Sequence, residues 1–202
     1  MVYGTGLGGG FVGRRIHVKV PLNRIGVVIG KGGENIKRLQ EKFHVRISVD
    51  TENGLVIIEP GEGVSAADML KAADIVRAMA LGFTPEQAFE LVDEDMILVV
   101  IDLKTVVGDN QSAIRRLKGR VIGEKGRAKR TIEEVTGTKI VVGDYHIGII
   151  GEYERAMAAK TAVEMLLEGR QHSTVYRHLE DIMRTVKRRE MMSYWRMRPR
   201  EE

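Results

Sequence analysis

A long internal repeat constrains the fold of this chain more than any other feature of its sequence. Residues 29–39 (IGKGGENIKRL) align with residues 122–132 (IGEKGRAKRTI), and the offset is 93 residues because Gly30 pairs with Gly123. A single Gly-x-x-Gly arises easily by chance in a chain with 23 glycines, but an extended match at a fixed period indicates two copies of one module. Further pairs are Glu41/Glu134, Arg46/Lys139 and Ile47/Ile140 at the same offset, and Ala72/Ala159, Val76/Val163 and Gly82/Gly169 at an offset of 87.

Hydrophobic periodicity predicts the same order of elements in both copies: strand, helix, glycine loop, helix, strand, strand, helix. In the first copy residues 15–20 alternate as a half-buried strand, Asn23 is placed to cap a short helix, and residues 65–81 predict a long helix. The second copy begins with an unusually apolar strand over residues 96–103. Each copy is followed by a further helical signal. The expected segments are a flexible glycine-rich arm (1–13), the first module (14–83), an acidic helical linker (84–95), the second module (96–170), and a basic C-terminal helix and tail (171–202).

Composition and charge narrow the classes of function. The chain has no cysteine, which excludes disulfides and thiolate chemistry, and no apolar run long enough for a membrane span, so we expect a cytoplasmic protein that does not bind membranes. The net charge of +4 is unevenly distributed: residues 84–103 carry six acids and no base, whereas residues 115–130 carry eight bases and one acid. Basic charge clustered around the second glycine loop is typical of a nucleic-acid site.

The chemistry of the loop indicates which residues would contact RNA. A glycine loop between two helices can direct backbone N–H groups at a phosphate oxygen, and helix N-termini add partial positive charge there. Apolar side chains beside the loop would form a groove for unpaired bases. The candidates in the first copy are Arg24, Ile25, Val28, Ile29, Gly30, Lys31, Gly32, Gly33, Lys37, Arg38, Arg46 and Ile47. Those in the second copy are Lys118, Arg120, Val121, Ile122, Gly123, Glu124, Lys125, Gly126, Arg127, Arg130, Lys139 and Ile140.

This order of elements, with Ile-Gly-x-x-Gly before a basic helix, resembles the type I KH domain in both copies. The resemblance implies an α+β fold, in which each βααββα module packs a three-stranded sheet on three helices. Residues 120–126 (RVIGEKG), 131–137 (TIEEVTG) and 172–176 (HSTVY) are also similar to archaeal members of the partner-of-Nob family of ribosome assembly factors.

That second resemblance covers about residues 14–180 and implies single-stranded RNA near the 3′ end of small-subunit rRNA as the ligand. It further implies the Nob-type endonuclease and the alpha subunit of translation initiation factor two as protein partners. Eukaryotic members have a degenerate first glycine loop, whereas residues 30–33 (GKGG) are intact here, so we expect the first module to bind RNA too. Glu124, an acid in a loop that would face phosphate, departs from the expected charge.

Other functions fit the sequence less well. Residues 26–32 (GVVIGKG) are one residue too short for a Walker loop and lack its Ser or Thr, and the glycines of residues 4–9 follow no strand. The five histidines are dispersed, and we expect no catalysis, cofactor or metal. The acidic linker and the basic tail could each bind a protein. A KH-domain regulator of messenger RNA or single-stranded DNA is the alternative function, because a glycine loop does not distinguish these ligands.

Overall fold

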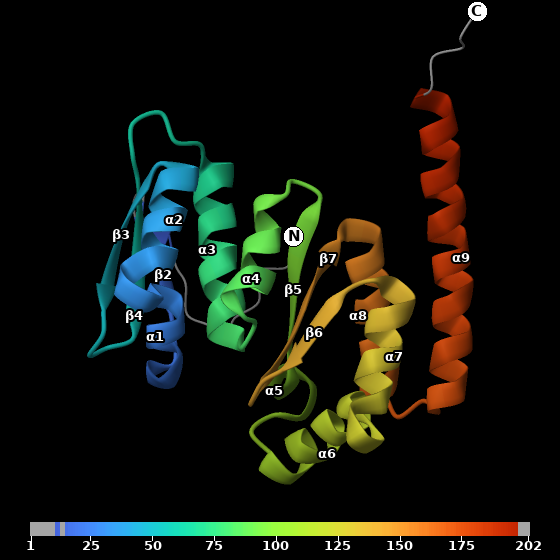
Figure 1. Cartoon of the computed structure of the whole chain (residues 1–202). Coiled ribbons are helices and arrows are strands. Elements are labelled where there is room, and N and C mark those ends of the chain that lie inside the picture. Colours follow the sequence, from blue (N-terminus) through green and yellow to red (C-terminus); the bar gives the residue numbers. More distant parts are fainter. Residues whose placement is uncertain (1–10, 13–14, 198–202) are drawn as a thin grey trace, which may run out of the picture. The chain divides into compact units, whose positions relative to one another are not determined.

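The computed structural model describes residues 11–12 and 15–197, and the chain divides into two compact units, Met1–Leu98 and Val99–Glu202 (Figure 1). The elements of the first unit are β1 (Phe11–Val12), β2 (Arg15–Lys19), α1 (Leu22–Ile29), η1 (Lys31–Gly33), α2 (Glu34–Phe43), β3 (Val45–Asp50), β4 (Leu55–Pro60), α3 (Ala66–Leu81), α4 (Pro85–Phe89) and η2 (Glu90–Val92).

The sheet of the first unit has the strand order β1-β2-β4-β3, with antiparallel pairing throughout. Alternation places Val18, Val56 and Ile58 on its inner face, where all three side chains are fully buried. The long helix α3 packs against β2 and β4, and its Ile75 and Val76 complete the core. Its N-terminus is capped by the Ser65 side chain, which accepts a hydrogen bond from the backbone N–H of Asp68.

The second unit repeats this plan. Its elements are β5 (Met96–Asp102, which begins in the first unit), α5 (Leu103–Val107), α6 (Gln111–Ile122), η3 (Glu124–Gly126), α7 (Arg127–Thr136), β6 (Lys139–Val142), β7 (His146–Glu152), α8 (Tyr153–Leu167) and α9 (His172–Met197). The strand order is β5-β7-β6, which matches β2-β4-β3 of the first unit. Ile132 of α7, Ile149 of β7 and Val163 of α8 are fully buried in its core.

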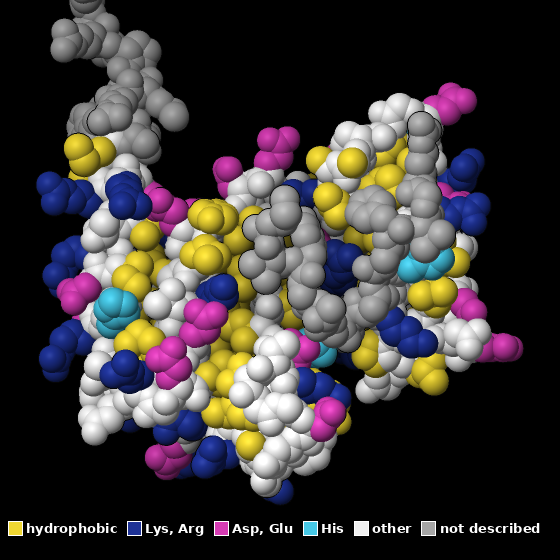
Figure 2. Space-filling model, turned by 180° about the vertical axis from the view of Figure 1, so that it is seen from behind, with side chains coloured by type: hydrophobic (Ala, Val, Ile, Leu, Met, Phe, Trp, Pro, Cys, Tyr) yellow, Lys and Arg dark blue, Asp and Glu magenta, His cyan; other side chains and the backbone are white. Residues whose placement is uncertain are grey.

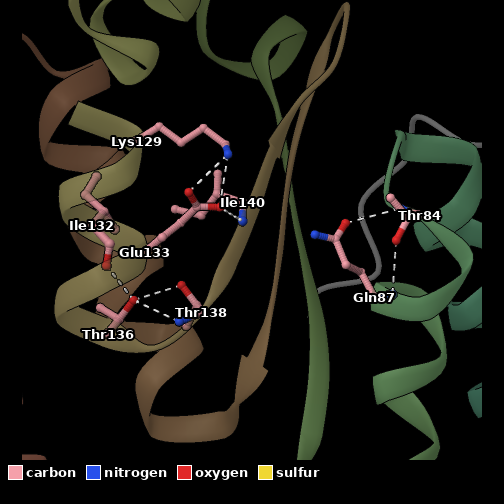
Figure 3. A network of polar contacts seen from close by, with 8 residues as sticks. All are labelled: Thr84, Gln87, Lys129, Ile132, Glu133, Thr136, Thr138 and Ile140. Carbon is pink, nitrogen blue, oxygen red and sulfur yellow. Dashed lines mark hydrogen bonds and ion pairs between the residues drawn. The ribbon is translucent and has the colours of Figure 1, made fainter. Parts of the chain in front are cut away.

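Local polar contacts hold α7 against the strand that follows it (Figure 3). The Glu133 carboxylate accepts a hydrogen bond from the backbone N–H of Ile140 at 2.7 Å and pairs with Lys129 on the preceding turn of α7. The buried Thr136 hydroxyl donates to the carbonyl of Ile132 at 2.7 Å and contacts the Thr138 hydroxyl. In the first unit, the Gln40 side chain makes the equivalent bond to Ile47 N–H at 3.0 Å, so both copies fix the helix to the edge strand in one way.

The fold class and the two modules predicted from the repeat are confirmed, with four local differences. Phe11 and Val12 of the expected flexible arm form an edge strand beside β2, and the rest of that arm lies outside the described residues. Helix α1 begins at Leu22 with Pro21 as its N-cap, so Asn23 lies in the first turn and is not the cap. Residues 103–107 form the short helix α5, because Asp102 caps it through the N–H of Lys104. Helix α9 continues to Met197.

The expected acidic linker is part of the first unit. Thr84 and Gln87 form a reciprocal capping box that starts α4 (Figure 3), and Phe89 and Leu91 are buried against α3. The Lys71 ammonium of α3 donates to the carbonyls of Asp93 (2.7 Å) and Met96 (2.8 Å), which fixes the end of the segment. The two compact units meet after Leu98, within β5.

Candidate nucleic-acid interface

The two glycine loops have the same backbone conformation. The first glycine of each has a positive φ, 76° at Gly30 and 71° at Gly123. The last glycine, Gly33 or Gly126, is in the left-handed region at 79° or 77°. Between them Gly32 (63°) has Lys125 (51°) as its counterpart, so the second loop holds a lysine in a conformation that side chains rarely adopt. Both loops are therefore built to one shape, which leads directly into the N-terminus of α2 or α7.

Packing explains why the first position of each loop is glycine. A Cβ added at Gly30 would lie 2.8 Å from the Asn35 side-chain nitrogen, and one at Gly123 would lie 2.6 Å from the Ala128 Cβ. Asn35 is itself buried and donates to the carbonyl of Val27 at 2.8 Å, which ties α2 to α1 across the loop. The last glycines, by contrast, have open space around an added Cβ and are required by their positive φ.

Neither a clash nor a positive φ requires glycine at positions 26 and 119. Gly26 and Gly119 are four residues before the loops, in the helices α1 and α6, and they are equivalent in the repeat because 119 − 26 = 93. Both are exposed, neither has a positive φ, and a Cβ at either would meet no atom within 4 Å. Glycine in a helix interior costs about 0.5–1 kcal/mol relative to alanine. Nothing inside the protein therefore requires glycine at either position.

These two glycines were not among the residues selected from the sequence. The signal that could have found them was present, since the repeat aligns them at the same offset as the loops. Their hydrogen bonds connect them to the loops as well: the N–H of Gly30 donates to the carbonyl of Gly26, and Gly123 donates to Gly119 in the same way. Gly26 and Gly119 therefore lie one helical turn before the loops and are bonded to the first glycine of each loop.

The seven apolar candidates fall into two groups, and the structure corrects four of them. Ile25, Val28 and Val121 are buried in the cores, because α1 and α6 turn these positions toward α3 and α8. Ile140 of β6 is buried too, so none of the four lines a surface groove. Ile29, Ile47 and Ile122 are half-exposed beside the loops and remain the apolar candidates.

Arg24 and Arg120 also need correction, because both guanidinium groups bind the chain itself. Arg24 donates to the carbonyls of Met79 (2.9 Å) and Phe83 (2.9 Å) at the end of α3. Arg120 donates to the corresponding carbonyls of Leu166 (2.8 Å) and Arg170 (2.6 Å) after α8. A cation at carbonyls that end a helix also opposes the negative end of the helix dipole. We assign both arginines to capping and omit them from the interface.

The two capping arginines are not equivalent in the repeat. Arg24 is six residues before Gly30 and Arg120 is three residues before Gly123, so they occupy successive turns of α1 and α6. Their acceptors are equivalent, since Met79 and Leu166 align at the offset of 87. The two modules therefore make the same contact from different positions in the sequence.

The remaining bases surround the loops. Lys31 and Lys37 are exposed in the first unit, as are Lys125 and Arg127 in the second. Arg38 stacks on the Phe89 ring, with its guanidinium carbon 3.9 Å from the ring centroid, and Arg46 is exposed on β3 opposite Glu59. In the second unit Arg130 of α7 donates to the carbonyl of Lys125 at 2.7 Å and so links α7 to the glycine loop. Lys118 lies 3.7 Å from Asp144, and Lys139 is half-buried on β6.

Each loop also carries one exposed carboxylate at a different place. Glu34 lies in the first turn of α2, where its counterpart in α7 is Arg127, and Glu124 stands where the first loop has Lys31. A carboxylate near a bound phosphate is unfavourable, and several bases lie beside each of these two. The charges therefore favour an anion at both loops without making the two sites identical.

No group of three or more histidines or acids between residues 15 and 197 is arranged to hold a metal ion. In the same part of the chain, no helix combines the length and the apolar character that a membrane crossing requires.

Comparison with known proteins agrees with this reading. Residues 97–184 match a family model described as a eukaryotic type KH domain of type I, and residues 15–76 match the KH domain model. The chain is 40% identical to a KH domain-containing protein of Methanocaldococcus jannaschii, over 85% of this chain and 75% of that one. It is 32% identical to the RNA-binding protein pno1 of Dictyostelium discoideum, over 85% of this chain and 73% of that one. This chain belongs to the PNO1 family.

One solved relative of this PNO1-family chain comes from a complex that contains rRNA. One chain in the crystal structure of the a/eIF2alpha-aDim2p-rRNA complex from Pyrococcus horikoshii OT3 is 37% identical, with a TM-score of 0.77. The match covers 85% of this chain and 94% of that one. The family predicted from residues 120–126, 131–137 and 172–176 is thus confirmed.

Proposed function

We propose that this protein is a non-catalytic RNA-binding factor of small ribosomal subunit assembly, and that it binds single-stranded rRNA near the 3′ end of the small-subunit RNA. The observation that carries the proposal is the pair of matched glycine loops, each preceded by a helix glycine that has no internal reason to be glycine. The names of the relatives support ribosomal RNA as the ligand: one is an RNA-binding protein pno1 and another was solved with rRNA.

The proposed contact combines a backbone clamp with a short groove. The phosphate backbone passes over Gly26 and the loop Gly30–Gly33 in the first unit, and over Gly119 and Gly123–Gly126 in the second. The exposed lysines and arginines neutralise phosphates, and the N-terminus of α2 or α7 adds its partial positive charge. Bases then turn toward the half-exposed Ile29, Ile47 and Ile122 beside the loops.

Each KH module of this kind holds about four nucleotides, so two modules on one chain raise the overall affinity through effective concentration. The protein partners we propose are a translation initiation factor two alpha subunit, which is present with the solved relative, and a Nob-type endonuclease that performs the cut. The cytoplasm is the proposed place of action.

Making the loops more negative tests the proposal. The variants are Lys31→Asp with Gly32→Asp, and Glu124→Asp with Lys125→Asp, and the measurement is the affinity for a labelled single-stranded oligoribonucleotide at two salt concentrations. We expect each pair to weaken binding by about tenfold or more, since contacts to several phosphates are lost or reversed, and the combined variant to lose most binding.

A matched control exists in the first unit. Gly63 is exposed, has a φ of 72° and has open space around an added Cβ, as Gly32 does, and Lys42 is exposed at the end of α2. Lys42→Asp with Gly63→Asp therefore repeats the charge change and the backbone strain away from the loop. Equal weakening by the control pair and the loop pair, or a folded combined variant that still binds like the wild type, would disprove the clamp. Tighter binding to the DNA version of the oligonucleotide would contradict an rRNA ligand.

A further inference from the structure

The C-terminal helix α9 is an addition to the two modules that neither glycine loop uses. It begins at His172, and its buried side chains Val175, Leu179, Met183 and Val186 pack against α7 and α8. The Arg155 side chain of α8 fixes it further, since its guanidinium makes two hydrogen bonds to the Glu190 carboxylate, at 3.0 and 2.9 Å. The orientation of α9 about its own axis is therefore determined.

The opposite side of α9 carries a stripe of arginines. Arg177, Arg184 and Arg188 are exposed and spaced by seven and four residues, which places them within about 40° of one another around a helix of 3.6 residues per turn. They are on the side of the helix opposite Val175 and Val186. Figure 2 shows Lys and Arg side chains along the outer edge of this helix. We call these three residues the α9 arginine stripe.

Bases outnumber acids on α9, and the stripe also holds a carboxylate, because Asp181 lies between Arg177 and Arg184 on the same side of the helix and Glu180 is exposed beside it. Residues 184–200 contain seven bases and a single acid, Glu190, whose carboxylate is bound by Arg155. Asp181 pairs with Arg184 at 3.3 Å at the surface, where such a pair contributes little. The matching segment after the first module, residues 84–95, is acidic instead, so the basic helix is a property of the second module only.

We propose that the α9 arginine stripe binds the phosphate backbone of double-stranded RNA. At 1.5 Å per residue the three arginines span about 16 Å along a straight, fixed helix, which fits a rigid row of phosphates. The stripe has no glycine loop, and the exposed residues beside its arginines, Glu180, Asp181 and Thr185, offer no aromatic ring on which an unpaired base could stack. A lipid surface fits poorly, because the apolar face of α9 is already buried against α7 and α8.

The site differs from the single-strand site proposed above, and the two can be tested separately. The variant Arg177→Gln, Arg184→Gln, Arg188→Gln removes three exposed charges and no buried contact. Three ligands are compared: a short single-stranded oligoribonucleotide, an RNA hairpin with a blunt stem, and the same stem with a single-stranded 3′ extension. We expect unchanged affinity for the single strand and a loss of about tenfold or more for both stem ligands, with a salt dependence that is smaller by about 2–3 in slope.

The control variant Lys19→Gln, Lys42→Gln, Lys104→Gln changes the net charge by the same amount at exposed positions elsewhere. The proposal is overturned if the control reduces stem binding as much as the stripe variant does, since the effect is then one of net charge. It is also overturned if the stripe variant binds all three RNAs like the wild type, as expected for a face that meets an acidic protein, or if it loses single strand and stem equally. The reversal Arg184→Glu with Arg188→Glu must enlarge the stem-specific loss.

Discussion

Replacing the two exposed helix glycines should change stability and RNA binding in opposite directions. Gly26 lies within α1 and Gly119 within α6, and an added Cβ meets no atom within 4 Å at either position. Gly26→Ala and Gly119→Ala should therefore each stabilise the protein by about 0.5–1 kcal/mol, the usual difference between glycine and alanine in a helix. Part of this gain comes from the smaller conformational freedom of the unfolded chain.

The effect on RNA should have the opposite sign and grow with side-chain size. Leucine has good helix propensity, so Gly26→Leu and Gly119→Leu keep the helix while adding bulk where the nucleic-acid backbone is proposed to pass. We expect each leucine to weaken single-strand binding by about tenfold, which corresponds to about 1.4 kcal/mol. Urea denaturation gives the stability, and fluorescence anisotropy with one labelled oligoribonucleotide at fixed salt gives the affinity.

Ala67→Leu is the matched control, because Ala67 is exposed in the first turn of α3. It adds the same kind of bulk to a helix surface away from the loops and should leave RNA binding unchanged. The reasoning is refuted if both leucine variants bind RNA as tightly as the wild type. Destabilisation by the alanine variants would also refute it, since that result would reveal an internal reason for glycine.

Three further predictions concern the contacts around the modules. Arg24→Met and Arg120→Met should each destabilise the fold by about 1.5–3 kcal/mol, because they remove charged hydrogen bonds to the ends of α3 and α8. The RNA affinity of the folded protein should not change. Urea denaturation and an RNA-binding assay on the same variants decide between capping and RNA contact. Glu190→Gln should speed hydrogen exchange in the later turns of α9 and leave α1–α3 unchanged, whereas unaltered exchange in α9 would show that the bond to Arg155 does not hold it. The pKa of Asp50 is lowered first by the hydrogen bond from the Asn53 side chain and then by that from the Asn53 backbone N–H. Ionised Asp50 therefore stabilises the fold above its unfolded pKa, and this stability is lost as pH falls through the folded pKa. Asn53→Ala should raise the Asp50 pKa in an NMR titration, and an unmoved pKa would disprove that cause.

The repeat predicted the fold because both modules obey the same local rules. The first and last glycines of each loop are required by a clash or by a positive φ, and the sequence preserves them at one offset. The Gln40 and Glu133 contacts to Ile47 and Ile140 are likewise at equivalent positions. Requirements of this kind repeat with the sequence, so alignment of the chain with itself finds them.

Other features depend on tertiary packing that a local pattern does not contain. The basic side chains of Arg24 and Arg120 fit a phosphate site from sequence, yet the ends of α3 and α8 fold back to within hydrogen-bonding distance of them. Val28 and Val121 flank the loops in sequence but face the core, because the helix turns them away from the surface. The short helix α5 was hidden because its apolar residues extend the apolar pattern of β5, and only the Asp102 cap marks its start.

Backbone amide chemical shifts during titration with a short single-stranded oligoribonucleotide test the central claim most directly. We expect the amide signals of Gly30–Gly33 and of Gly123–Gly126 to shift with saturation, together with those of Gly26 and Gly119. The amide signals of the α9 arginine stripe should not shift. Saturable binding that leaves both sets of loop amides unmoved would contradict the central claim.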